Sequence, residues 1–295
     1  MRIDFEDATP KHNRIKIGTI VILVILFVGL FGVLGMYYAK LYNFNIFAEL
    51  KKNYQEYIEE QKTNPKEEQT LNQVLPIYTE KSKQAMQKIY NIDTKIAYLT
   101  FDDGPSEVVT NLILDVLKEQ NVKATFFVLG SNVNKYPQIV KRAYKEGHYI
   151  ANHGYSHNYD KIYSSVNSVL EEYNKTEKAI QKAIDVKEYS SHLFRFPGGY
   201  SGGSYKTIKK QAGELLNKNN ISYIDWNILT GDAQGANTKE KILNNVKKYL
   251  KDKGNIVLLM HDSSSKMLTY ETLTEIINYL RSEGYIFDNF YNVMR

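Results

Sequence analysis

The 295-residue chain contains no cysteine, and this absence excludes two kinds of structure. There is no disulfide framework, so the chain is not a small scaffold stapled by disulfides. There is also no thiolate metal site, so any metal ion must be held by histidine and carboxylate side chains. At this length the chain can bury a substantial core and form about two structural units.

The chain also lacks a strong excess of one charge, because its formal net charge at pH 7 is only +5. Lysine and arginine are interleaved with aspartate and glutamate and form no basic stripe, which argues against a nucleic-acid partner. Hydrophobic residues make up 43% and charged residues 24% of the sequence. This composition excludes a wholly disordered or collagen-like chain.

One long uncharged segment stands out near the N-terminus, from Ile17 to Tyr38. About 22 apolar or small residues are enough to cross a bilayer as a helix, and the segment is too long for a typical signal peptide. Lys11, Arg14 and Lys16 precede it, whereas Lys40 stands nearly alone after it. The positive-inside rule therefore predicts a cytoplasmic N-terminus and a single-pass membrane protein whose bulk lies outside the cell.

We expect four regions along the chain. Residues 1–16 form a short cytoplasmic N-terminus and residues 17–38 a transmembrane helix. The charge-dense residues 39–91 form a partly helical extracytoplasmic stalk, broken near Pro65. Residues 92–295 form the main globular domain.

Within that last region, short β-rich runs alternate with amphipathic helical stretches, which is typical of parallel β/α units. We expect about seven strands: Ile96–Phe101, Ala124–Leu129, Tyr149–Asn152, Leu193–Phe196, Tyr223–Trp226, Ile256–Met260 and Tyr285–Phe287. The expected helices are Glu107–Gln120, Tyr136–Glu146, Val166–Ile184, Ser204–Asn219, Lys239–Lys253 and Tyr270–Glu283. The fold class is α/β, and a β/α barrel and an open doubly wound sheet both fit this pattern.

Polar clusters follow several of these strands, at the sheet edge where such folds place their sites. Three of the six histidines, His153, His157 and His261, lie there. His153 and His157 are four residues apart, so a helical turn or tight loop would bring both imidazoles to one side. With Asp103 as a third ligand they would form a catalytic metal site, although an isolated pair with this spacing is more often incidental.

The neighbouring carboxylates Asp102 and Asp103 admit a division of labour. One can bind the metal while the other accepts a proton from water as a general base, unless the pair is only a turn with good turn chemistry. His261 could donate a proton to a leaving group, with Asp232 fixing its tautomer and raising its basicity. Alone, His261 would more simply be a structural histidine.

Taken together, the clusters resemble the polysaccharide deacetylase family, the NodB-homology domain of carbohydrate esterase family 4. They run in the family's order as TFDDGP (100–105), His-x-x-x-His (153–157), Arg-x-Pro (195–197), Gly-Asp (231–232) and Leu-x-His (259–261). The resemblance extends from about Ile92 to the C-terminus, and TFDDGP is its most specific part. It implies a distorted β/α barrel and metal-dependent removal of acetyl groups from N-acetylhexosamines.

The resemblance also implies a role for each matching residue. Asp103, His153 and His157 would bind the metal, with zinc as the default and cobalt or nickel held by similar ligands. Asp102 would be the base, oriented by Arg195, and His261 the acid, tuned by Asp232. Leu259 and Trp226 would line the acetyl pocket, and the backbone N–H near Gly198 would stabilise the oxyanion.

Four positions depart from the family pattern. Gly154 replaces the usual serine or threonine between the two histidines, and Asn158 replaces a frequent proline. Gly198 replaces a tyrosine, and Ala233 replaces a tryptophan. None of these changes removes a ligand or a proton-transfer group, so they predict altered substrate fit more than loss of activity.

The leading hypothesis is a membrane-anchored enzyme that removes acetyl groups from N-acetylglucosamine in peptidoglycan or a wall-linked polysaccharide. The glycan is its expected partner, the N-terminal helix its membrane contact, and no protein partner is evident. An O-acetyl polysaccharide esterase is the alternative enzyme. A catalytically silent glycan-binding module is the alternative outside enzymes, but it would need neither a base nor an acid.

Overall fold

The structure is a computed structural model that describes residues 75–92 and 94–294. The expected cytoplasmic segment, the expected transmembrane helix and most of the expected stalk lie outside these residues. Within the described ranges, no helix is both long and apolar enough to span a membrane.

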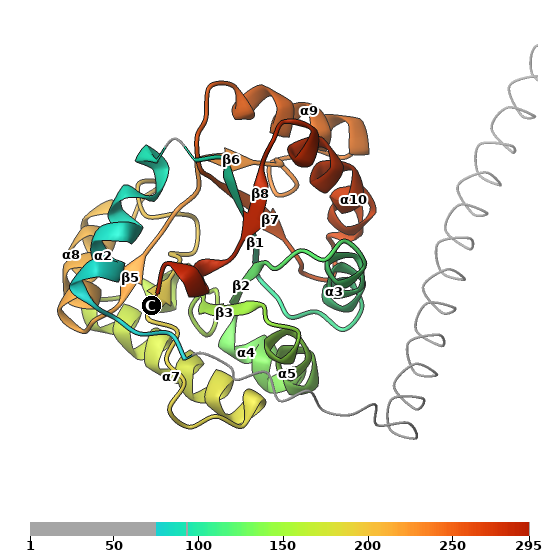
Figure 1. Cartoon of the computed structure of the whole chain (residues 1–295). Helices are drawn as coiled ribbons and strands as arrows, with labels where there is room; N and C mark the ends of the chain where they lie inside the picture. The colour runs from blue at the N-terminus through green and yellow to red at the C-terminus, as the bar shows by residue number, and fades with distance from the viewer. Residues whose placement is uncertain (1–74, 93, 295) are drawn as a thin grey trace, which may run out of the picture. The chain divides into compact units, whose positions relative to one another are not determined.

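A curled parallel sheet forms the centre of the described region (Figure 1). Its strands follow the order β5-β4-β3-β2-β1-β7-β6, and β8 pairs with the first half of β1. The bounds are β1 Ile96–Asp102, β2 Thr125–Val128, β3 Tyr149–Asn152, β4 Leu193–Phe194, β5 Ser222–Tyr223, β6 Ile228–Leu229, β7 Ile256–His261 and β8 Ile286–Asp288. All pairings are parallel, and the described residues form no ladder between β5 and β6, so the barrel is open there.

The two faces of the sheet bury different clusters because successive side chains on a strand alternate between faces. On the inner face, one apolar cluster collects side chains from several strands, including Tyr98, Phe127 and Val257. Such convergence requires the sheet to curl. The same alternation places Asp102 and His261 on the inner face beyond this cluster, at the carboxyl ends of β1 and β7, where they are register partners.

Helices cover the outer face of the sheet (Figure 1). Their bounds are α3 Val109–Glu119, α4 Gly130–Lys135, α5 Pro137–Lys145, α6 Tyr159–Ile162, α7 Val166–Ile184, α8 Lys206–Lys218, α9 Lys239–Leu250 and α10 Met267–Ser282. Helix α7 begins where the Ser165 side chain accepts a hydrogen bond from the Ser168 N–H. An N-cap of this kind satisfies one of the helix's free N–H groups.

A short N-terminal helix, α2 (Glu80–Lys88), and the 3₁₀ turn η1 (Ile89–Asn91) pack onto the sheet. Met86 and Ile89 are buried in the inner cluster, together with Phe290 of the C-terminal turn η2 (Phe290–Asn292). In Figure 1, α2 lies beside α8 and β5. These residues fall within the segment expected as a stalk, but here they fill the inside of the open barrel.

Two expected strands are only two residues long in the structure, and one strand was not expected. The expected strand Leu193–Phe196 is β4, which ends at Phe194. The expected strand Tyr223–Trp226 is β5, Ser222–Tyr223, and a separate strand β6, Ile228–Leu229, follows it. A two-residue strand carries no alternating pattern that could reveal it. The change matters because β6 pairs with β7, so the loop carrying Asp232 emerges beside His261.

Candidate active site

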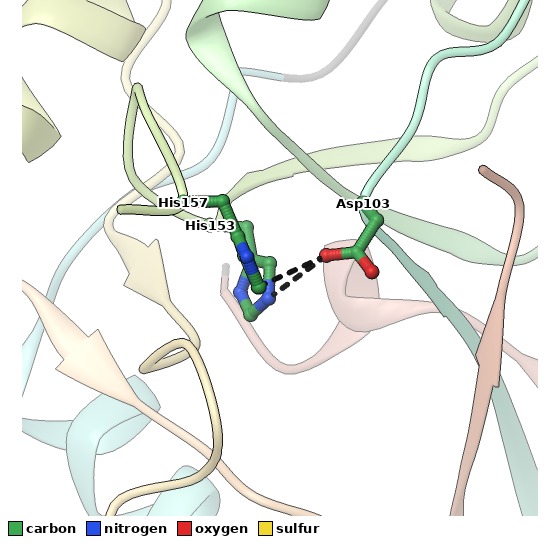
Figure 2. A group of neighbouring side chains, drawn as sticks. All are labelled: Asp103, His153 and His157. Carbon is green, nitrogen blue, oxygen red and sulfur yellow. Dashed lines mark ion pairs between the residues drawn. The ribbon is translucent and has the colours of Figure 1, made fainter. Parts of the chain in front are cut away.

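Three side chains meet at the carboxyl ends of β1 and β3 (Figure 2). Asp103 Oδ1 lies 3.5 Å from Nε2 of His153 and 3.3 Å from Nε2 of His157. Asp103 directly follows β1, and His153 directly follows β3. Parallel strands place these ends at one edge, so the topology brings the three residues together.

This cluster fits a divalent metal ion. The buried Asp103 Oδ1 has no hydrogen-bond partner, although it points between two imidazoles. A buried polar atom without a partner is costly, and a bound cation would satisfy it. Ligands at zinc bond lengths of ~2.0–2.1 Å and tetrahedral angles are roughly 3.3 Å apart, close to both separations here. One carboxylate and two histidines form a donor set that suits zinc and similar metals.

The imidazole of His153 is held in the orientation that a metal ligand needs. Its Nδ1 is 2.8 Å from the backbone oxygen of Arg195, which leaves Nε2 facing Asp103. Burial lowers the pKa of His153 to about 3, despite the opposing effect of the Asp103 carboxylate. The ring is therefore neutral at pH 7, which is the form that binds metals.

A buried ion pair lies next to the cluster. Arg195 Nη1 donates to Asp102 Oδ1 at 2.9 Å and to Thr100 Oγ1 at 2.7 Å, and the arginine stacks on the Phe127 ring. Asp102 Oδ2 faces the cluster of Asp103, His153 and His157, 3.8 Å from His153 Nε2. Burial raises the pKa of Asp102, and the Arg195 charge opposes that rise. A carboxyl pKa moved toward neutrality suits a general base, because base strength rises with pKa.

A second pair joins β7 to the loop after β6. His261 Nδ1 is 2.9 Å from Asp232 Oδ1, while Asp232 Oδ2 accepts hydrogen bonds from the His261 N–H and from Thr269 Oγ1. Burial of His261 opposes protonation, but its hydrogen bond to the Asp232 carboxylate and the charge of that carboxylate outweigh this and raise the pKa. The imidazole thus has one nitrogen fixed and Nε2 left for proton transfer.

The three residues expected to contact substrate lie in different surroundings. Leu259 is buried on the same face of β7 as His261. Gly198 adopts a left-handed φ of 73°, and a Cβ there would lie 2.7 Å from the Tyr159 hydroxyl. Trp226 packs over Gly199 and lines a cavity of about 430 Å³ between α2 and β5. Asp103, His153 and His157 do not line that cavity.

The structure shows what two of the residues that depart from the family pattern do locally. Asn158 caps α6, since its side chain accepts a hydrogen bond from the Lys161 N–H. Gly154 has a left-handed φ of 80°, and its loop is bonded to Glu172 of α7. Sequence reasoning did not single out Glu172, because a Glu171-Glu172 pair within a helix has the pattern of a solvated face.

Comparison with known proteins identifies the family of this chain. A family model described as polysaccharide deacetylase matches residues 89–215. The chain is 37% identical to the putative polysaccharide deacetylase YheN of Bacillus subtilis over 68% of this chain and 69% of YheN. It is 32% identical to a peptidoglycan-N-acetylglucosamine deacetylase of Bacillus cereus over 72% of this chain and 75% of that protein.

A solved structure agrees with these sequence matches. The structure of a Streptococcus mutans CE4 esterase superposes with a TM-score of 0.65 at 30% identity, covering 72% of this chain and 92% of that one. The chain therefore belongs to the polysaccharide deacetylase family and is a hydrolase of the deacetylase type.

Proposed function

We propose that the protein is a metal-dependent N-deacetylase of N-acetylglucosamine residues in cell-wall glycan, with peptidoglycan as the first candidate. The observation that carries the proposal is the buried, unpartnered Asp103 Oδ1 between the Nε2 atoms of His153 and His157. Relatives named for peptidoglycan N-acetylglucosamine support the substrate class.

In the proposed site, Asp103, His153 and His157 hold the metal, for which zinc is the first candidate. A bound divalent ion would polarise the acetyl carbonyl and make water a stronger acid. Asp102 Oδ2 takes the proton from the attacking water, while Arg195 holds the carboxylate in place. The water oxygen bonds to the acetyl carbon.

The second half of the reaction breaks the bond between the acetyl carbon and the nitrogen. His261 Nε2 donates a proton to the departing nitrogen, because an unprotonated amine anion is a poor leaving group. Asp232 holds the resulting imidazole in place through Nδ1. Leu259 forms a wall for the acetyl methyl group, and the Gly198 N–H stabilises the oxyanion. The products are acetate and a free amine on the sugar.

The whole chain is proposed to work beside the membrane. Residues 1–16 would be cytoplasmic, residues 17–38 would span the bilayer, and the catalytic domain would lie outside. A neutral acetamide would become an amine that is cationic near neutral pH, so the wall would gain positive charge.

Acetate release by the purified full-length protein tests this function. N-acetylglucosamine oligomers and whole peptidoglycan serve as substrates, before and after chelation and after zinc is added back. We expect release that stops with the chelator and returns with zinc, and that is abolished in Asp103→Asn. The exposed Asp252→Asn is the matched control. Full activity in Asp103→Asn would contradict the metal site.

An O-acetyl esterase is the second candidate, because one solved structure that resembles this chain is called an esterase. An alkoxide leaves more readily than an amine anion, so ester hydrolysis depends less on the acid. If the natural reaction is amide hydrolysis, His261→Ala should lose most amide turnover and keep ester turnover. Wild-type release of acetate from esters alone would favour the esterase.

A further inference from the structure

The loop between the two histidine ligands, residues 154–156, has an unusual anchor. Both Gly154 and His157 adopt left-handed φ angles, 80° and 52°. A left-handed residue other than glycine is strained and persists only where its surroundings fix it. His157 is also the more exposed of the two histidines, so its position depends on how the loop is held.

Glu172 holds this loop from α7. Its Oε2 accepts hydrogen bonds from two successive backbone N–H groups, Tyr155 at 2.6 Å and Ser156 at 2.7 Å. Hydrogen bonds to a carboxylate are roughly twice as strong as those between neutral groups. Helix α7 is 19 residues long and capped, so it offers a rigid support.

The rest of the loop backbone is anchored as well. Asn152 Oδ1 accepts from the Gly154 N–H, and the N–H groups of Gly130 and Ser131 donate to the oxygens of Gly154 and Tyr155. The side chain of Tyr155 lies under the Lys175 ammonium, 3.7 Å from its ring centre. Glu172 is the only carboxylate among these anchors that touches the loop backbone in the described residues.

A side chain at position 154 would be strained, because the backbone of Gly154 has a left-handed φ of 80°. A Cβ on Gly154 would lie 2.9 Å from Ile162 Cδ1 and 3.5 Å from Glu172 Oε2. Gly154 carries no hydroxyl, and the Glu172 carboxylate lies next to it and accepts hydrogen bonds from the two N–H groups that follow it.

We propose that Glu172 is a positioning residue for metal ligand His157. By fixing the two N–H groups before it, Glu172 keeps the strained His157 backbone in place and aims Nε2 at Asp103 before any metal arrives. The inference rests on the proposed metal site and deepens it.

Zinc affinity of the full-length protein provides the test, measured by competition with a chromogenic chelator. Removing a group that orients a metal ligand typically weakens binding 10–100-fold. We expect Glu172→Ala to weaken zinc binding by roughly that factor. The matched control is Glu171→Ala, an exposed neighbour on the same helix, which should stay within about twofold of wild type.

A double-mutant cycle separates positioning of His157 from a general effect on the fold. In a His157→Ala background, Glu172→Ala should weaken zinc binding no further, because the ligand it positions is gone. An equal loss in both backgrounds would overturn the proposal, and so would unchanged affinity in Glu172→Ala. If Glu172→Ala does not fold, Glu172→Gln provides the test. Glutamine keeps an oxygen that can accept a hydrogen bond but loses the charge, so zinc binding should weaken by a smaller, measurable factor. Unchanged affinity in that variant would overturn the proposal.

The outcome is independent of the deacetylation test. If zinc binding depends on Glu172 but no substrate releases acetate, the proposed reaction is contradicted and the role of Glu172 is supported. If acetate is released but zinc affinity does not change in Glu172→Ala, the proposed reaction is supported and the role of Glu172 is contradicted.

Discussion

Asp103 and His157 both adopt left-handed backbone conformations, with φ angles of 75° and 52°. Each such residue costs on the order of 1–3 kcal/mol and needs neighbours that fix it. The Asn132 side-chain amide donates to the backbone oxygen of Asp103 at 2.8 Å, and Glu172 binds the loop before His157. At this scale, two strained backbone positions bring the side chains of Asp103 and His157 to within 3.3 Å of each other.

The pairing of His261 with Asp232 predicts a change in pH dependence. As the proposed acid, His261 would work only when protonated, so the rate should fall as the pH rises through the pKa of His261, which Asp232 raises. Asp232→Asn should therefore move the alkaline limb of the pH–rate profile to lower pH and reduce kcat by roughly 10²–10⁴-fold. Acetate release measured across pH checks this. The exposed Asp185→Asn should leave the profile unchanged.

Gly198 predicts a stability effect at a single residue. Alanine there would be strained at a φ of 73° and would crowd the Tyr159 hydroxyl. Gly198→Ala should lower the free energy of unfolding by about 1–3 kcal/mol, measured by urea denaturation. A Cβ added at Gly202 would meet no other atom within 4 Å, so Gly202→Ala should change stability by less than about 0.5 kcal/mol. Equal effects of the two substitutions would contradict this account.

Among the elements, α2 and η1 join parts of the chain that are distant in sequence. Their residues Met86 and Ile89 pack with Tyr98 and Val257 inside the curl of the sheet, and Ile77 N–H donates to Met294 oxygen. The barrel is open between β5 and β6, because these two described strands do not pair with each other. The segment therefore contributes to the core and is more than a spacer.

Truncating this contact should destabilise the domain. Ile89 is buried, so Ile89→Ala removes packed methyl groups and should lower the free energy of unfolding by about 2–5 kcal/mol. Ile77 is 53% exposed, and Ile77→Ala should cost far less. Thermal or urea unfolding of both variants makes the comparison. A small effect of Ile89→Ala would mean that the packing of η1 into the core is dispensable for the fold.

For the whole molecule, metal binding should couple to folding, because the unfolded chain does not hold the three ligands together. Zinc at about 100 times its dissociation constant should stabilise the fold by roughly 2.7 kcal/mol. For a domain of this size that raises Tm by about 5–11 °C. Thermal unfolding with zinc and with chelator measures the shift. The increase should vanish in Asp103→Asn and persist in Asp252→Asn.

The predicted anchor is also a property of the whole chain. Full-length protein should sediment with membranes and resist a carbonate wash, because about 22 apolar residues insert stably into a bilayer. A variant lacking residues 1–38 should appear in the soluble fraction. Protease added outside wall-free cells should remove the catalytic domain if the predicted orientation is correct. Retention of the shortened variant in the membrane pellet would contradict residues 17–38 as the anchor.

The sequence predicted several elements closely, with α7 found at Val166–Ile184 as expected, because long amphipathic helices carry a clear period. It missed β6, whose two residues carry no pattern, and it assigned residues 80–91 to a stalk because α2 is largely polar. The polar clusters at strand ends pointed to one edge of the sheet. Local patterns of this kind could reveal Asp103, His153 and His157, but not Glu172.

What the sequence determined by itself is the chemistry: no thiolate ligands, an ordered set of carboxylates and histidines, and a parallel β/α alternation that gathers strand ends at one edge. Only the tertiary structure decided which atoms meet. Arg195 donates to Oδ1 of Asp102, and Asp232 pairs with Nδ1 of His261. Glu172 binds the loop between His153 and His157. These contacts join residues from different elements. Their distances depend on how sheet and helices pack, which no local pattern of side chains encodes.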